Sequence, residues 1–138
     1  QAQILELLKE LEEEYTTSIV LITHDMGVVA TVCSKVAIMY GGLIMECGTS
    51  EEIFYGPRHP YTKAPLRAIP SLDLEEGGRL QSIPGLPPSL NNPPAGCPFA
   101  KRCTQAQKRC HKELPGYQEF SETHRAMCFL NAREEERA

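Results

Sequence analysis

The sequence contains no tryptophan, and no apolar run approaches the ~20 residues that a membrane-spanning helix needs. It has no long cluster of lysine and arginine, and its net charge of -4 gives no electrostatic case for nucleic acid or for an anionic membrane surface. No basic leader precedes the first amphipathic pattern, so we expect no signal peptide and a chain cut from a longer protein. What remains is an ordinary globular composition, 41% apolar and 23% charged, with enough length for a modest core.

The first third of the chain has the pattern of an α/β protein. Residues 1–14 carry apolar side chains at three- and four-residue spacing, which predicts an amphipathic helix with an acidic solvated face. Residues 18–22 form a short β-branched run typical of a parallel strand buried on both sides. Asp25 then predicts the N-cap of a helix over residues 26–32.

A hairpin and a short helix are predicted next. Two apolar runs, 35–40 and 43–47, are separated by Gly41-Gly42, whose two turn positions favour glycine because both need positive φ. Thr49 and Glu52 have the spacing of a capping box and predict a helix that stops at Gly56-Pro57.

The character of the sequence changes after residue 56. Another helix is predicted to start at Pro60, capped by His59, and to kink or break at Pro65. Six prolines between Pro84 and Pro98 then predict an extended arm rather than regular structure. The predicted fold class is therefore α/β with two parts: an α/β portion over 1–56 and an irregular, proline-rich, cysteine-bearing extension over 57–138.

Several motifs in this order resemble one family of proteins. Residues 19–30, Ile-Val-Leu-Ile-Thr-His-Asp-Met-Gly-Val-Val-Ala, resemble the switch-histidine segment of ABC ATPases, and residues 36–48 resemble the strand pair that follows it. Residues 1–4 resemble the segment just after the D-loop. The run 58–62, the Ile-Pro-Gly at 83–85 and the late cysteines are similar to the C-terminal extension of oligopeptide and dipeptide importer ATP-binding subunits.

The resemblance implies an intact subunit that couples ATP and Mg²⁺ binding and hydrolysis to peptide import. It implies a peripheral position on the cytoplasmic face of the cell membrane. It also implies transmembrane permease partners, a second ATPase subunit and, indirectly, a peptide-binding protein, with no role for nucleic acid. Without its nucleotide-binding half, the fragment should expose apolar surface and strand edges and self-associate.

The sequence lacks the glycine-rich loop with a lysine at Walker A spacing that cradles ATP phosphates. We therefore expect the fragment alone to be inactive. A rival interpretation is a non-enzymatic metal-binding or redox-sensing module. A phosphate loop in the upstream coding sequence would favour the ATPase, and its absence would favour the module.

His24 is the one catalytic candidate. By spacing alone a histidine at a strand end is most often a polar loop residue, but the resemblance implies contact with the γ-phosphate and orientation of the attacking water. Asp25 is sufficiently explained as a helix cap. His59, Tyr61 and Thr62 make up the family's His-Pro-Tyr signature, for which we favour a packing role.

Four cysteines lie in the last third of the chain, while Cys33 and Cys47 have the pattern of buried fillers. The four are Cys97, Cys103, Cys110 and Cys128, spaced C-x5-C-x6-C-x17-C. Two disulfides, four buried thiols and a metal centre are all compatible with this spacing, but a reducing compartment disfavours the disulfides. A metal centre best explains the count of cysteines in so polar a segment, and the resemblance implies a [4Fe–4S] cluster, with zinc as the second choice.

Basic residues interleave with the thiols and would offset the charge of a cluster: Lys101, Arg102, Lys108, Arg109 and Arg125. His111 and His124 are the additional zinc-ligand candidates.

Overall fold

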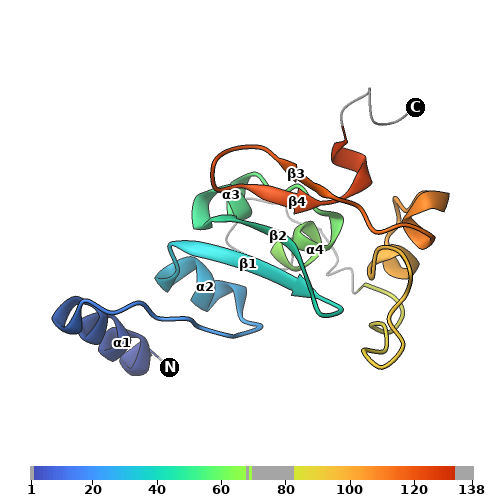
Figure 1. Cartoon of the computed structure of the whole chain (residues 1–138). Helices are drawn as coiled ribbons and strands as arrows, with labels where there is room; N and C mark the ends of the chain where they lie inside the picture. Colours follow the sequence, from blue (N-terminus) through green and yellow to red (C-terminus); the bar gives the residue numbers. More distant parts are fainter. Residues whose placement is uncertain (1, 68, 70–82, 133–138) are drawn as a thin grey trace.

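The computed structural model describes residues 2–67, 69 and 83–132. In chain order the helices and strands are α1 (Ala2–Tyr15), α2 (Met26–Val32), β1 (Lys35–Tyr40), β2 (Leu43–Thr49), α3 (Ser50–Tyr55), α4 (Pro60–Leu66), the 3-10 helices η1 (Ala100–Arg102) and η2 (Lys108–His111), β3 (Tyr117–Glu119), β4 (Arg125–Met127) and the 3-10 helix η3 (Phe129–Asn131). The four strands form one antiparallel sheet in the order β1-β2-β4-β3 (Figure 1). The protein is thus a mixed α/β structure, as its sequence predicts.

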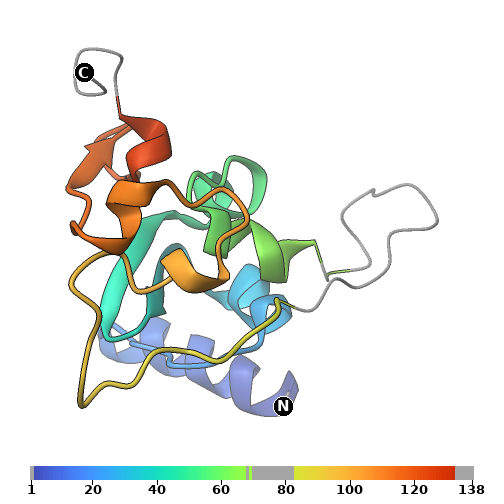
Figure 2. The same cartoon turned by 90° about the vertical axis from the view of Figure 1, so that its right-hand side faces the viewer.

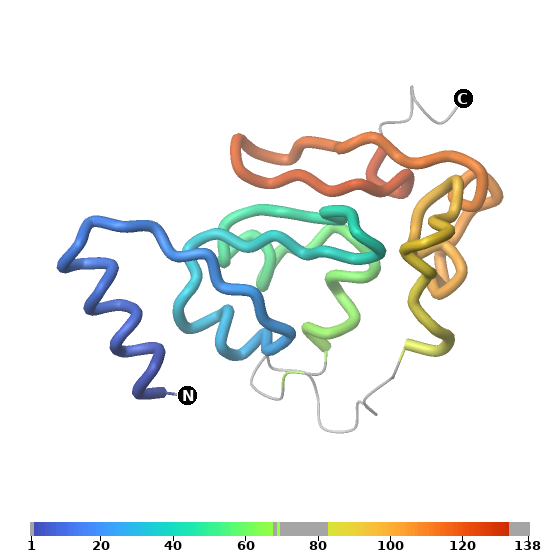
Figure 3. The backbone as a smooth tube through the Cα atoms, turned by 60° about the horizontal axis from the view of Figure 1, so that its bottom comes forward, coloured from blue at the N-terminus to red at the C-terminus, as the bar shows by residue number. Residues whose placement is uncertain are grey.

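Helix α1 lies apart from the sheet at one end of the molecule (Figure 3). None of its residues is buried, and Ile4 and Leu7 on its apolar side are 63% and 54% exposed. The amphipathic pattern therefore forms the predicted helix, but its apolar face has no cover within the described part of the chain.

The predicted parallel strand over residues 18–22 is wrong for this structure. The segment is extended without being assigned to a strand, and Val20 and Ile22 are 88% and 95% exposed. A parallel strand needs neighbouring strands to satisfy its backbone groups. The four strands of the described sheet pair with one another antiparallel and leave this segment unpaired.

The β1–β2 hairpin forms as predicted, and helices cover one of its faces. Gly41 and Gly42 adopt φ of +56° and +82°, the left-handed values that the tight turn requires. Along β1, buried and exposed residues alternate, and Val36 and Ile38 pack with Val29 of α2 and Ile53 of α3. The other face of β1 is open.

Both predicted caps of the following helices are present. The hydroxyl of Thr49 accepts from the N–H of Glu52 at 3.2 Å, and the Glu52 carboxylate accepts from the N–H of Thr49 at 2.8 Å, which completes the capping box of α3. The N-cap of α4 is His59, and this helix ends at Leu66, one residue after Pro65.

The extension contributes strands to the same sheet as the first part of the chain. The proline-rich arm over 83–98 has no helix or strand, as expected. Strand β4, however, pairs with β2 through Glu46↔Ala126 and Cys47↔Arg125, and β3 forms the sheet edge. The extension is therefore only partly irregular, and the hydrogen-bonded sheet crosses the boundary expected at residue 56.

The arm and the 3-10 helices η1 and η2 lie together at the hairpin-turn end of the sheet (Figure 2). A Cβ placed on Gly41 would lie 2.6 Å from the Cβ of Pro98, so the arm sits directly against the turn. No helix among the described residues is long and apolar enough to cross a membrane.

Candidate functional site

The structure separates His24 from the four cysteines of the extension. His24 is exposed and lies in the segment that leads into α2. Its neighbour Asp25 caps that helix, accepting from the N–H groups of Gly27 at 2.9 Å and Val28 at 3.1 Å. The cap fixes the backbone next to His24 and leaves the imidazole available to a ligand from outside this chain.

The four late cysteines line one small cavity of about 20 Å³. Cys97 and Cys110 belong to the buried core beside η1 and η2, Cys103 packs against that core, and Cys128 follows β4. The N–H of Cys97 donates to the carbonyl of Cys110 at 2.8 Å. These two backbones meet closely because Gly96 has no side chain: a Cβ there would collide with the carbonyl oxygen of Cys110.

Burial sets the chemistry of these thiols. Removal from water raises the pKa of Cys97 and Cys103, and it raises the pKa of Cys128 to about 11. Electrostatic interaction with the thiols of Cys97, Cys103 and Cys110 contributes further to the raised pKa of Cys128. All six cysteines of the chain carry free thiols.

The cysteine cavity is not a preformed metal site. Across residues 2–67, 69 and 83–132, no group of three or more His, Cys, Asp or Glu side chains has the arrangement of a metal site. The sequence therefore predicts which cysteines share a cavity, whereas their binding of a metal stays a prediction.

Arg102 has a different role from the charge compensation expected of it. Its guanidinium donates to the carbonyl of Ile83 at 3.0 Å, to the carbonyl of Pro84 at 3.1 Å and to the hydroxyl of Tyr40 at 3.0 Å. It thus fastens the start of the arm to the end of β1, immediately before Cys103. The other two arginines of the set also stack on aromatic rings: Arg109 lies over Phe129, which lines the cavity, and Arg125 lies over Tyr117, which does not.

The His-Pro-Tyr segment joins the two parts of the chain, as its predicted packing role requires. Nδ1 of His59 accepts from the N–H of Tyr61 at 3.0 Å, and the ring is 1% exposed. Burial lowers the pKa of His59 to about 4, so the ring is neutral near pH 7 and able to accept this bond. Tyr61 packs between Tyr40 and Phe99, with ring centroids 4.6 Å and 5.3 Å away.

Glu46 is the residue that sequence analysis missed. Its side chain is 0% exposed, yet its Oε1 accepts from the N–H of Arg58 at 2.7 Å and its Oε2 from the N–H of His59 at 2.8 Å. Oε1 also lies 2.6 Å from Nε2 of His124, the residue that precedes β4. One carboxylate of β2 therefore holds the start of α4 and the beginning of β4. His124, expected as a spare zinc ligand, is engaged in this contact.

A second carboxylate ties α3 to the loop between β3 and β4. Glu52 accepts from the hydroxyls of Ser121 and Thr123 as well as from its own capping box. These bonds, that from Ser121 foremost, lower the pKa of Glu52 to about 2. The capping residue predicted for a local helix is thus also a long-range anchor for the extension.

The sequence of the chain matches one protein family and several known proteins. Residues 45–110 match the family described as "Oligopeptide/dipeptide transporter, C-terminal region". All 138 residues align at 49% identity with a dipeptide transport ATP-binding protein of Bacillus subtilis, over 41% of that protein. A dipeptide transport ATP-binding protein of Lactococcus lactis is 52% identical over 94% of the chain and 37% of that protein. An oligopeptide transport ATP-binding protein of Salmonella typhimurium is 47% identical over 94% of the chain and 38% of that protein.

These matches place the chain in the class of ABC ATP-binding subunits. The match to the C-terminal region of the oligopeptide/dipeptide transporter family runs from Met45 in β2 through α3, α4 and the arm to the first three cysteines of the cavity. The chain spans about two fifths of the length of the curated relatives it matches.

Proposed function

We propose that this chain is part of the ATP-hydrolysing subunit that energises peptide import by an ABC transporter. The observation that carries the proposal is the 49% identity of all 138 residues to a dipeptide transport ATP-binding protein. The intact subunit would bind ATP and Mg²⁺, lie on the cytoplasmic face of the membrane, and work with permease subunits and a second ATPase subunit.

His24 is the proposed catalytic residue of this segment. His24 is exposed and lies between the extended segment 18–22 and the N-cap of α2. Phosphoryl transfer is accelerated mainly by positioning and charge, so an imidazole held beside the capped helix would orient the γ-phosphate and the attacking water. The phosphate-cradling groups would come from outside residues 1–138.

The 138-residue chain should not bind ATP by itself. It lacks the glycine-rich loop and lysine that supply most of the phosphate affinity. Isothermal titration of the chain with Mg-ATP should give no saturable heat, whereas the complete subunit should bind in the micromolar range (about 8 kcal/mol). Micromolar binding to the 138-residue chain would contradict the assignment of the site to upstream residues.

We further propose that the cysteine cavity holds a metal centre, a [4Fe–4S] cluster in the first place and one zinc ion in the second. Its support is that all four predicted ligands, Cys97, Cys103, Cys110 and Cys128, line one cavity although the outermost are 31 positions apart in the sequence. A polar cap with few apolar residues would be stabilised by such a centre, because ordering its backbone costs roughly 1–2 kcal/mol per residue. A metal would also favour the thiolate form that burial alone disfavours.

Metal analysis after anaerobic purification tests this second proposal. The expected result is brown protein with about four iron atoms per chain and a broad visible absorption, as a four-cysteine cluster requires. Cys110→Ser should abolish both, and Cys33→Ser, which changes a cysteine outside the cavity, should leave them intact. One zinc per chain would select the second choice, and iron-free and zinc-free protein would refute the metal centre.

A non-enzymatic metal-binding or redox-sensing module is the rival function. It would keep the cysteine centre and use the α/β part as a platform only. The identity to ATP-binding relatives along the whole chain favours the ATPase subunit.

A further inference from the structure

The open face of the sheet carries a groove of about 430 Å³, a volume within the range of small-ligand sites. A row of directly paired residues crosses all four strands in this groove: Ala37 opposite Cys47, Cys47 opposite Arg125, and Arg125 opposite Glu119. Paired residues point to the same face, and this face is opposite the one that Val36 turns toward α2 and α3.

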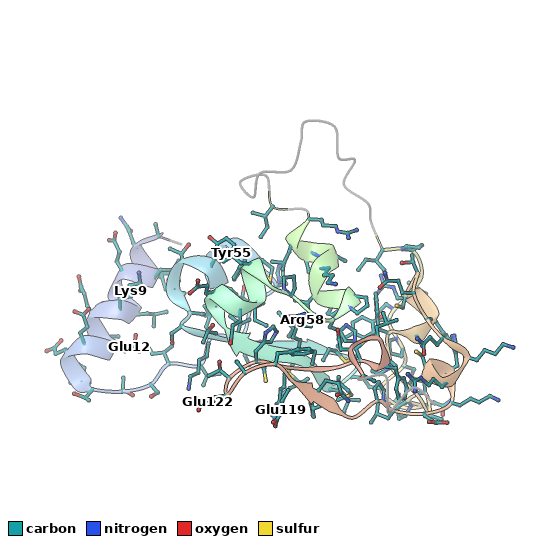
Figure 4. The ribbon with its side chains drawn as sticks, turned by 90° about the horizontal axis from the view of Figure 1, so that it is seen from above. Lys9, Glu12, Tyr55, Arg58, Glu119 and Glu122 are labelled. Carbon is teal, nitrogen blue, oxygen red and sulfur yellow. The ribbon has the colours of Figure 1, made fainter. Side chains whose placement is uncertain are left out.

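The two ends of the groove carry opposite charges. Lys35, on β1, lines one end, whereas Glu119 of β3 and Glu122 of the following loop line the other. Figure 4 shows the two glutamates along one side of the molecule, with Lys9 and Glu12 on α1 at one end. In the described part of the chain none of these three groove charges forms an ion pair.

The middle of the groove is lined by small side chains and by one cation that is already engaged. Ala37, Cys47 and Gly48 leave room over the strands. Arg125 donates to Sγ of Cys47 at 3.3 Å and stacks over the ring of Tyr117 at 4.6 Å. Arg125 also interacts electrostatically with Glu119, its direct neighbour on β3, so Lys35 and Glu122 are the groove charges that this arginine does not engage.

The separation of the ends matches a short peptide. Strands β1 and β3 are three strand spacings apart, roughly 14 Å at ~4.8 Å per step. An extended tripeptide is about 10 Å long at ~3.3–3.6 Å per residue, and the lysine and glutamate side chains shorten the remaining gap. A free peptide is also cationic at one end and anionic at the other.

We infer that this groove binds a short peptide of about three residues with free termini. The carboxylates of Glu119 and Glu122 bind its N-terminal ammonium, and the Lys35 ammonium binds its C-terminal carboxylate. The small residues Ala37, Cys47 and Gly48 along the groove leave room for peptide side chains of different sizes. A subunit with such a groove could sense the cargo that its relatives transport; that role rests on the proposed function, whereas the binding itself does not.

Titration of the complete subunit with trialanine, without nucleotide, tests the inference. Unblocked trialanine should bind about a hundredfold more tightly than N-acetyl-trialanine amide, because each charged terminus contributes about tenfold through a charge-assisted hydrogen bond. E119Q/E122Q and K35Q should each weaken binding of the unblocked peptide by about tenfold. The matched changes E12Q and K9Q on α1 should leave it unchanged.

Equal affinity for blocked and unblocked trialanine, no binding, or unchanged binding to both K35Q and E119Q/E122Q would overturn the inference. All five substituted positions carry exposed side chains, so the variants should fold like the parent, which circular dichroism checks. The titration reads peptide binding and not ATP turnover. A negative result would therefore leave the proposed ATPase function standing, and failure of ATP hydrolysis would leave the binding result standing.

Discussion

His24→Ala in the complete subunit should lower ATP turnover by about 10²-fold, or ~2.7 kcal/mol in the activation barrier. The nucleotide affinity should stay nearly unchanged, because it comes mainly from phosphate-binding groups outside this chain. The physical reason is that an oriented imidazole acts on the transferring phosphoryl group and the water, not on the bound ground state. Steady-state ATPase kinetics of the assembled transporter, with nucleotide binding measured separately, gives both quantities.

His111→Ala provides the matched control, because His111 is another exposed histidine but lies in η2 of the extension. It should leave turnover within about twofold of the parent, less than ~0.5 kcal/mol. If His24→Ala also stayed within that limit, the catalytic role of His24 would be refuted.

Glu46→Ala should destabilise the protein by about 3–5 kcal/mol, the range for removing one partner of a buried charged contact. The substitution leaves the N–H groups of Arg58 and His59 and the ring of His124 without their common acceptor. Glu46→Gln should cost less than Glu46→Ala but more than ~1 kcal/mol, since its amide group faces a donor in place of an acceptor oxygen. Urea unfolding monitored by circular dichroism measures both losses.

Glu51→Gln is the control for this experiment, because Glu51 is an exposed glutamate five positions away on α3. Its free energy of unfolding should remain within about 0.5 kcal/mol of the parent. A similarly small effect of Glu46→Ala would show that the contacts of Glu46 do not hold the extension to β2.

The elements with local signals were predictable from the sequence. Gly41-Gly42 fixes a hairpin because the turn geometry depends on those two residues alone. The capping box of Thr49 and Glu52 and the cap at Asp25 are likewise satisfied within three residues of the helix start. Convergence of the cysteines was predictable for a different reason: four thiols in a short polar segment have few other structural uses.

The features that depend on distant partners were not predictable. The hydrogen-bond partners of Glu46 are Arg58, His59 and His124, which follow it by 12, 13 and 78 positions. Nothing near Glu46 in the sequence marks it as buried. Strands β3 and β4 have three residues each, too few to show a two-residue alternation. The parallel strand over 18–22 was predicted from a genuine apolar run, but a strand forms only where neighbours are available to pair with it.

Uptake of a labelled dipeptide into membrane vesicles tests the central claim most directly. The complete subunit would be assembled with its permease partners, the second ATPase subunit and the peptide-binding protein, and uptake would be compared with and without ATP and with the His24→Ala subunit. The account predicts ATP-dependent accumulation that the substitution reduces in proportion to ATP turnover. ATP-independent uptake, or no uptake by an assembly that hydrolyses ATP normally, would contradict a role in energising peptide import.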